Sequence, residues 1–406
     1  MSELKGIEYL RTKLSYKQPR IKLRYQFYEM KNHTRDFGIS TPPDLKYFNS
    51  ALGWCAKAVD SLADRLQFRE FENDNFAINE IYDMNNPDVL FNSAILSALI
   101  SSCSFIYISK DADGFPRLQV IDGYNATGEI DPFTNMLTEG YAVLSRDKNG
   151  NVIEEAYFIQ GRTDYYVNGK FTESFTNKAP YALLVPVIYK PDAIRPFGHS
   201  RISRACMSLV ESAVRTVKRS EISAEFYSYP QKYITGLSQD VEFDRWKASM
   251  SSLLTLTKDD EGSNPSVGQF TQQSMQPHID QLRMFASLFA GECGLTLDDL
   301  GFATANPSSA EAIKSAHENL RLSARKAQST FGSCFLNVGY LAACLRDDFN
   351  YNRSQLYLTK AKWLPIFEPD SAMLSSIGDG AIKINQAIPN FINNDNLSDL
   401  TGIINE

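Results

Sequence analysis

The chain has 406 residues. Because a single hydrophobic core rarely supports a chain of this length, two or three domains are expected. Its composition, 43% hydrophobic and 12% aromatic, excludes a largely disordered protein. The formal net charge of −7 excludes a protein that holds nucleic acid through a general basic coat, so any DNA contact must be local or weak.

The N-terminal region combines apolar periodicity with positive charge. Residues 3–14 and 18–33 have the three- and four-residue spacing of two helices. Lysine and arginine clearly outnumber glutamate here. The basic face either lies in solvent or contacts an anionic partner, and the sequence leaves both interpretations open. Because this start is amphipathic and charged, no secretory signal is expected.

Six cysteines are spaced irregularly, without a CxxC pair. Most fall in apolar helical or strand contexts, which favours buried thiols in a reducing compartment such as the cytosol over disulfides. They are Cys55, Cys103, Cys206, Cys293, Cys334 and Cys344.

Helices and buried strands are predicted between residues 41 and 108. A helix is expected to begin at 41–44 and to run through Leu66, and residues 66–71 then alternate as a strand. Asn86-Pro87-Asp88 opens the next helix. The charge-free segment 89–108 is long enough to cross a bilayer. Its asparagine and serines fit better a buried helix that turns at the serines into a buried strand.

An antiparallel meander of about six strands is predicted from Phe105 to Phe175, where the apolar period falls to two. Turn signals at 111–114, 147–150 and 168–169 separate the strands. Residues 182–189 form one more buried strand, in which Pro186 favours an edge or bulged position.

The pattern then changes to long helices. One is predicted from His199 to about Tyr227, roughly 40 Å long. Its basic positions could meet phosphates or acidic residues of neighbouring helices. Residues 228–275 predict a small α/β unit with strands at 232–236, 253–257 and 267–271 and a helix at 240–251. A helix returns at about 277–293.

An acidic loop and the longest helix follow. The loop 294–307 ends at Asn306-Pro307, after which 308–311 has the capping-box pattern of a helix start. The helix is predicted to run for roughly 55 Å, a length unusual inside one globule. Residues 355–367 are expected to form a strand, and the remainder one or two short acidic helices separated by Pro389.

Motifs for enzymatic chemistry are not found. There is no nucleotide-binding loop, zinc motif or nucleophile elbow, and the four histidines have no companion at ligand spacing. We therefore expect no catalytic residue, no metal site and no cofactor. The acidic pairs Asp298-Asp299 and Asp259-Asp260 keep a metal-dependent nuclease open as an alternative, although adjacent acids usually face water.

The order of these parts and two passages resemble the portal family of tailed bacteriophages, in the branch typical of siphophages. Phe197–Ile202, followed by Ser220–Phe226 and Pro230–Gly236, is similar to that family's passage GxSxI, helix, EF and PQ+xxxG. Leu295–Phe302 with Asn306–Ile313 is similar to its loop-to-long-helix passage. The resemblance covers nearly the whole chain.

The resemblance implies an α+β, multidomain ring subunit with long stem and tunnel helices, a β-rich wing and a small α/β clip. Its parts are the wing (1–197, helices plus antiparallel meander), stem helices (198–227 and 276–293), clip (228–275), tunnel loop (294–307), long tunnel or wing helix (308–346), wing strand (347–367) and short crown (368–406).

It also implies a ring of about twelve copies at one capsid vertex of the virion, made in the host bacterial cytoplasm. Double-stranded DNA would be packaged and ejected through it. The terminase large subunit and later a head-completion adaptor would bind the clip, and the major capsid and scaffolding proteins would surround the ring, with no membrane. A non-channel oligomeric virion adaptor is the other alternative.

Three groups of residues carry these implied contacts. The tunnel loop would present Thr296, Asp298, Asp299, Thr304 and Asn306 to DNA. The stem would use Arg215, Lys218 and Arg219 in the channel or between subunits. The clip surface would offer Asp240, Glu242, Asp244, Lys247, Asp259, Asp260 and Glu261 to the terminase and the adaptor. An acidic chain suits a channel in which DNA must slide.

Overall fold

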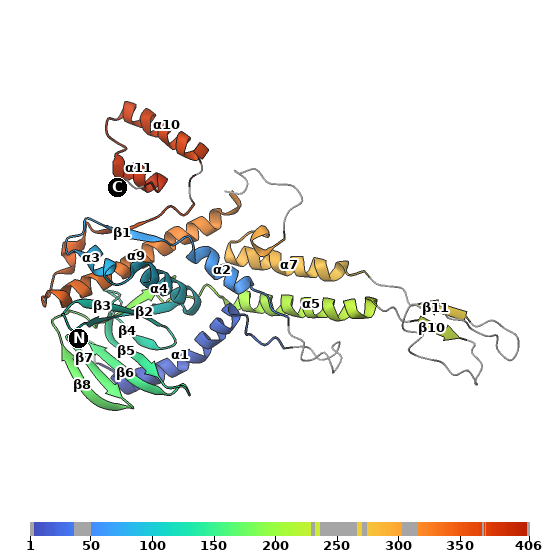
Figure 1. The fold of residues 1–406 in the computed structure, drawn as a ribbon, viewed down its shortest axis with the longest axis horizontal. Helices are drawn as coiled ribbons and strands as arrows, with labels where there is room; N and C mark the ends of the chain where they lie inside the picture. Colours follow the sequence, from blue (N-terminus) through green and yellow to red (C-terminus); the bar gives the residue numbers. More distant parts are fainter. Residues whose placement is uncertain are drawn as a thin grey trace. The chain divides into compact units, whose positions relative to one another are not determined.

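A computed structural model describes residues 4–35, 50–228, 232–235, 266–269, 274–302, 315–367, 369 and 371–403 (Figure 1). The chain forms two compact units. The larger contains residues 1–32, 53–207 and 290–406, and the smaller contains residues 33–52 and 208–289. Both units combine helices and strands, so the predicted mixture of α and β structure is confirmed.

The first element is a single helix, α1 (Ile7–Tyr28), so the prediction of two helices is wrong. Pro19 lies inside α1. Proline lacks the N–H that would bond the carbonyl four residues earlier and usually ends or kinks a helix. Here the preceding turn is held by the sheet: Lys17 donates to Thr127 Oγ1 (3.1 Å), and Gln18 donates to the Tyr124 carbonyl (3.1 Å). These contacts allow α1 to continue.

The next helix, α2 (Trp54–Ala63), is shorter than expected. Residues 50–53 are not helical, and the proposed start at 41–44 lies outside the described residues. Gly53, a poor helix former, precedes α2. The predicted strand is found as β1 (Phe68–Glu72), and a short helix, α3 (Ile78–Asp83), follows it.

Helix α4 (Pro87–Ser101) turns at the serines into strand β2 (Cys103–Lys110), as predicted. Ser102 has φ 88°, a left-handed conformation that reverses the chain. Ser101 Oγ donates to the Ser97 carbonyl (2.6 Å), and Ser104 Oγ donates back to the Ala94 carbonyl (2.7 Å). The serines thus satisfy the turn internally. Among the helices that the structure describes, none is both long and apolar enough to cross a membrane.

The strands between residues 103 and 188 form two sheets, where the meander predicted from Phe105 to Phe175 would have been one. β4 (Ala126–Ile130), β5 (Leu137–Arg146), β6 (Val152–Ile159), β7 (Arg162–Val167) and β8 (Lys170–Thr176) make a five-stranded antiparallel meander. β2 and β3 (Pro116–Asp122) belong instead to a separate sheet with the order β3-β2-β9. Helices α4 and α9 both contact β2, which is buried along most of its length. A fully apolar strand needs such two-sided cover.

β9 (Leu184–Ile188) is an edge strand, as Pro186 predicted. The Leu183 carbonyl accepts the Ile108 N–H of β2 (3.0 Å), and the Tyr189 N–H donates to the carbonyl of Ser102, directly before β2 (3.0 Å). By antiparallel alternation, Pro186, three residues from each, then faces away from β2. The missing N–H of proline therefore costs no bond within the sheet.

The longest helix is α9 (Glu318–Arg346), which packs through glycines. A Cβ on Gly339 would lie 2.1 Å from the Ile78 side chain, and one on Gly332 would lie 2.7 Å from Ala361 Cβ. The prediction of an unbroken helix from residue 308 is wrong, since His317 is a non-helical N-cap; residues 303–314, including the predicted capping box, lie outside the described part.

The strand predicted at 355–367 is found only as β12 (Lys360–Trp363), which pairs antiparallel with β1. A 3₁₀ helix, η3 (Arg353–Leu356), precedes it. Trp363 lies edge-on to Phe68 (centroids 5.4 Å apart), and Phe68 also contacts Phe91 (4.3 Å). Phe91 in turn contacts Phe335 of α9 (4.7 Å). This aromatic cluster joins β1 and β12 to α4 and α9.

Two helices follow at the C-terminal end, α10 (Ser371–Ala387) and α11 (Asn394–Thr401). Pro389 lies between them, as expected. The Asn385 side chain joins the connection to α10 by exchanging hydrogen bonds with the backbone of Ile392 (both 2.8 Å).

Helix α5 (Arg204–Ser228) begins later than the predicted His199, because Ser203 is the residue that caps it: its Oγ accepts the Cys206 N–H (3.1 Å). In the smaller unit α5 pairs antiparallel with α7 (Gln276–Cys293), joined by Thr216 and Gln281 (3.1 Å). β10 (Lys232–Thr235) and β11 (Ser266–Gln269) form an antiparallel pair. The helix at 240–251 and the strand at 253–257 fall outside the described residues.

Candidate functional site

The acidic loop begins where Gly294 ends α7. Gly294 has φ 66°, and the Leu295 N–H bonds back to the Ala290 carbonyl (2.9 Å), which is the pattern of a Schellman cap. A Cβ on Gly294 would also lie 3.3 Å from Asn319 Cβ on α9. Glycine is therefore favoured here by the backbone conformation, and a larger residue would also crowd α9.

Thr296 and Asp299, two of the expected tunnel-loop residues, are brought together. Asp299 Oδ2 accepts from the Thr296 N–H (2.8 Å) and hydroxyl (2.9 Å), while Thr296 Oγ1 accepts the Asp299 N–H (3.2 Å). This reciprocal arrangement is a capping box, and it opens the 3₁₀ helix η2 (Asp298–Leu300). The Asp299 carboxylate thus has a structural task in shaping the loop.

The remaining loop residues divide into those described and those not. Asp298 is exposed, whereas Asp299 is half-buried, with Oδ2 3.8 Å from Nδ1 of His317. Thr304 and Asn306 lie outside the described residues. In the part of the chain that is described, no three histidine, cysteine, aspartate or glutamate side chains gather as metal ligands would.

The three expected stem residues all lie on α5. Lys218 is buried, with 7% of its surface exposed, and Arg215 and Arg219 are half-buried. Arg215 Nη2 donates to Ser212 Oγ (2.9 Å) on the same helix. Their expected contacts with DNA or with another subunit remain a prediction. The expected clip residues all fall within 236–265, outside the described residues.

The passage Phe197–Ile202 proves to be a structural junction. Gly198 has φ 71°, and a Cβ on it would lie 2.0 Å from the Tyr189 carbonyl oxygen. Arg201 is buried and donates to the carbonyls of Ala58 (3.1 Å) and Cys293 (2.6 Å). Arg201 therefore ties the middle of α2 to the end of α7, and it precedes α5, the helix whose basic positions were considered for phosphate contact.

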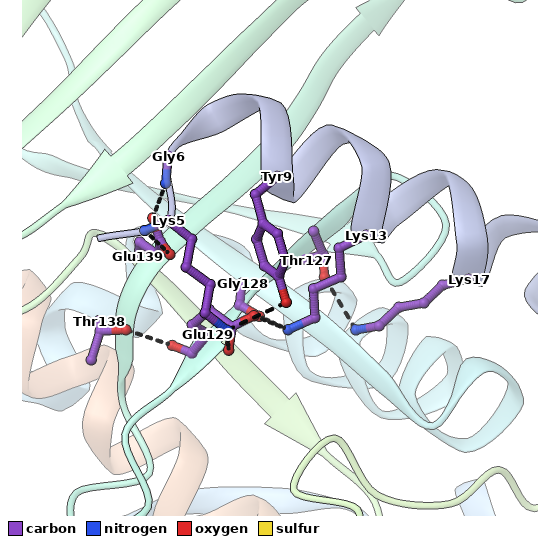
Figure 2. Close-up of polar contacts among 10 residues, drawn as sticks. All are labelled: Lys5, Gly6, Tyr9, Lys13, Lys17, Thr127, Gly128, Glu129, Thr138 and Glu139. Atoms are coloured by element: carbon purple, nitrogen blue, oxygen red, sulfur yellow. Dashed lines mark hydrogen bonds and ion pairs between the residues drawn. The ribbon is translucent and has the colours of Figure 1, made fainter. Parts of the chain in front are cut away.

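The basic N-terminal helix is docked on the five-stranded sheet through three glutamates, two of which, Glu139 and Glu129, are drawn in Figure 2. Glu139, with 1% of its surface exposed, accepts the N–H groups of Lys5 (3.0 Å) and Gly6 (3.1 Å) and the hydroxyl of Tyr157 (2.8 Å). A carboxylate is well placed there because a helix N-terminus carries partial positive charge.

Glu129 forms the second contact. Lys5 and Lys13 both pair with its carboxylate, and Lys13 also donates to the Gly128 carbonyl (2.7 Å). Burial alone would raise the pKa of Glu129, but hydrogen bonds and charge from Lys13 and Lys5 outweigh it and lower the pKa. Deeper in the sheet, Arg11 pairs with the buried Glu155.

Of the two interpretations left open for this basic face, intramolecular pairing accounts for most of it. Lys5, Lys13 and Arg11 pair with glutamates, and Lys17 meets a threonine of β4 and the ring of Phe197. Burial lowers the pKa of Lys17. Leu10 and Leu14 complete the contact by packing against Tyr141, Val143 and Tyr157.

The chain is similar in sequence to two known proteins. It is 24% identical over 332 residues to the portal protein of Mycobacterium phage L5, spanning 76% of this chain and 68% of that protein. It is also 24% identical over 339 residues to the portal protein of Mycobacterium phage D29, spanning 78% of this chain and 69% of that one. No family model matches.

Solved structures with similar chains come from gene transfer agent particles. A chain in the neck of the native particle, computed with C12 symmetry, is 13% identical with a TM-score of 0.48, covering 95% of this chain and 100% of that one. A chain in the neck of the empty particle, computed with C6 symmetry, is 13% identical with a TM-score of 0.49, covering 93% and 98%.

Proposed function

We infer that this chain, which belongs to the portal family of tailed bacteriophages, is a subunit of the ring at one capsid vertex through which double-stranded DNA enters and leaves the head. The observation that carries this inference is the similarity to two curated portal proteins over about three quarters of the chain. We propose that the ring is part of the virion, contains about twelve copies and has no catalytic chemistry of its own.

Exposed apolar side chains on α7 support assembly with sister copies. Ile279, Met284 and Leu288 are each about half exposed, at 53%, 49% and 54%. Large apolar groups in contact with water are typical of surfaces that another protein covers. We propose that α5 and α7 are the stem helices and that a neighbouring copy covers these side chains.

The loop after α7 is proposed to face the DNA. Asp298 is exposed on it, and the Thr296–Asp299 capping box holds the turn that presents it. A negative side chain at this place would keep phosphate contacts weak, so that DNA can slide. Thr304 and Asn306 are proposed to continue the same surface.

The clip, residues 228–275, is proposed to bind the terminase large subunit during packaging and a head-completion adaptor afterwards. Its acidic positions, together with Lys247, would form the docking surface. The major capsid and scaffolding proteins are proposed as neighbours of the wing. Reversing charge at Asp240, Glu242 and Asp244 should weaken terminase or adaptor binding while rings persist.

The ring is tested by charging the exposed face of α7. In the double variant Met284→Lys with Leu288→Lys, each subunit contact loses the burial of the exposed half of two apolar side chains, worth roughly 1.5–3 kcal/mol in total. The protein concentration required for ring formation, measured by analytical ultracentrifugation, should rise at least about tenfold.

Ser287→Lys is the matched control, because it places the same charge at a polar, exposed position of the same helix. Control rings should form normally. Unchanged assembly of the double variant would contradict the proposed stem contact.

The DNA path is tested by Asp298→Lys in assembled rings. If Asp298 faces the channel, affinity for double-stranded DNA should rise, and its dependence on salt should become steeper. Glu8→Lys, at a position whose side chain is 80% exposed on α1, makes the same charge change elsewhere. Equal behaviour of the two variants would contradict the channel position.

A further inference from the structure

Two cysteines meet where the α5 and α7 helices join the larger unit. Cys206 lies in the first turn of α5, and Cys293 is the last residue of α7. Their Sγ atoms are 3.3 Å apart, although the residues are separated by 87 positions in sequence. Both are buried, with 1% and 4% of their surface exposed. Each thiol is therefore the other's neighbour inside the protein.

The surroundings favour a thiolate on Cys206. Its backbone N–H is capped by Ser203, and its Sγ lies 3.3 Å from the Ser203 hydroxyl. The hydrogen bond from Cys293 is the largest influence and lowers the pKa of Cys206, while the same contact raises the pKa of Cys293. Position in the first turn of a helix acts in the same direction. Cys206 is thus the thiolate that would react first, and Cys293 the thiol that would react second.

We propose that Cys206 and Cys293 are a dithiol that closes to a disulfide when the subunit meets a disulfide oxidant. The Cys206 thiolate attacks one sulfur of the oxidant, forming a mixed disulfide and releasing one thiolate. Cys293 then loses its proton and attacks Cys206 Sγ, which releases the second thiolate. Two protein thiols are oxidised by two electrons, and the oxidant is reduced to two thiols.

The bond would fasten the start of α5 to the end of α7. Arg201 already ties this point to α2 through the Cys293 carbonyl (2.6 Å), so the disulfide would add a covalent link to an ordered junction. Formation of the disulfide does not depend on the proposed function. Only the stage at which it forms, after release of the particle, rests on that function. The bacterial cytoplasm keeps thiols reduced, and a released particle meets oxidising conditions.

Cys55 is the competing partner, because it is fully buried and near enough to interact electrostatically with both Cys206 and Cys293. Cys55 also lies in the first turn of a helix, α2, but burial raises its pKa and so disfavours its thiolate. A link to Cys55 is therefore not expected.

The test treats the full purified chain with oxidised glutathione in its native state, then blocks free thiols and maps the peptides. The wild type should show a Cys206–Cys293 link, a mass lower by about 2 Da and reversal by dithiothreitol. Its unfolding temperature should rise by about 5–15 °C because a long loop is closed. Cys293→Ser should stop at a mixed disulfide on Cys206, and Cys206→Ser should form no link.

Cys344→Ser is the control, because Cys344 is equally buried and should leave the link intact. If a serine variant fails to fold, the wild-type peptide map decides alone. No Cys206–Cys293 link in the native wild type, or a dominant link to Cys55, overturns the proposal. Ring formation is followed separately by electron microscopy, so a failure of the proposed function is distinguished from a failure of the disulfide.

Discussion

Replacing Glu139 by glutamine should loosen α1 from the five-stranded sheet. Both carboxylate oxygens of Glu139 accept backbone N–H groups, from Lys5 and Gly6, and one also accepts the Tyr157 hydroxyl. Glutamine has nearly the same shape, but one of its terminal atoms is a donor. At least one backbone N–H therefore loses its acceptor and faces another donor.

The expected cost follows from these contacts. A hydrogen bond to a charged group contributes about 1.5–3 kcal/mol. Removing the negative charge beside the helix N-terminus adds roughly 0.3–1 kcal/mol. The local opening of α1 should become easier by roughly 2–4 kcal/mol, so the protection of its amides against hydrogen exchange should fall roughly 30- to 1,000-fold.

Hydrogen exchange with mass spectrometry, read on peptides of α1, measures this directly. Glu8→Gln is the control, because the Glu8 side chain is 80% exposed and pairs only with Arg11 among the described contacts. The control should lower protection less than about tenfold. Equal protection of α1 in the Glu139→Gln and Glu8→Gln variants would refute the reasoning.

Three further perturbations test other parts of the account. Gly294→Ala should lower the free energy of unfolding by about 1–2 kcal/mol, because alanine is strained at the left-handed φ of Gly294. An unchanged midpoint in denaturant unfolding would contradict the C-terminal cap of α7. Since the pKa of Glu129 is lowered in the fold, its contribution to stability should be complete above the ordinary glutamate pKa of about 4.3 and should be lost as the pH falls through the lowered value. Hydrogen exchange of α1 should show this loss, and Lys13→Met should reduce it. Arg201→Lys should lower the free energy of unfolding by about 2 kcal/mol, since lysine cannot bond both carbonyls. Arg204→Lys, at an exposed site, should lower it by under about 0.5 kcal/mol. Equal denaturant midpoints of the two variants would contradict the proposed link between α2 and α7.

Elements with strong local signals were predictable. The serines inside an apolar run marked the change from α4 to β2, because their hydroxyls can satisfy the backbone of a tight turn. Asn168-Gly169 marked the β7–β8 hairpin, and both residues have the positive φ that such a turn requires. In these places local preference and tertiary packing act in the same direction.

Elements decided by distant contacts were not predictable. The break predicted between residues 14 and 18 is absent, because contacts with the sheet region hold the helix turn before Pro19. The two sheets could not be told from one meander, because strand pairing depends on which strand is covered on both faces. The non-helical His317 gave no signal in the helical periodicity.

The candidate site was predictable only in part. The pattern of Thr296 followed three residues later by Asp299 is the local signal of a capping box, and it could have shown that this aspartate shapes the loop. Glu139 falls on the same strand face as Tyr141 and Val143, which indicates burial. Lys5 and Gly6, however, whose N–H groups it accepts, lie more than 130 residues away, so the docking of α1 had to come from the structure.

The central claim is that the chain assembles into a ring around a channel. Electron microscopy of the purified full-length chain tests it most directly. We expect closed rings of about twelve copies with an axial opening wide enough for a DNA duplex. Single compact subunits at every protein concentration, or assemblies without a central opening, would contradict it.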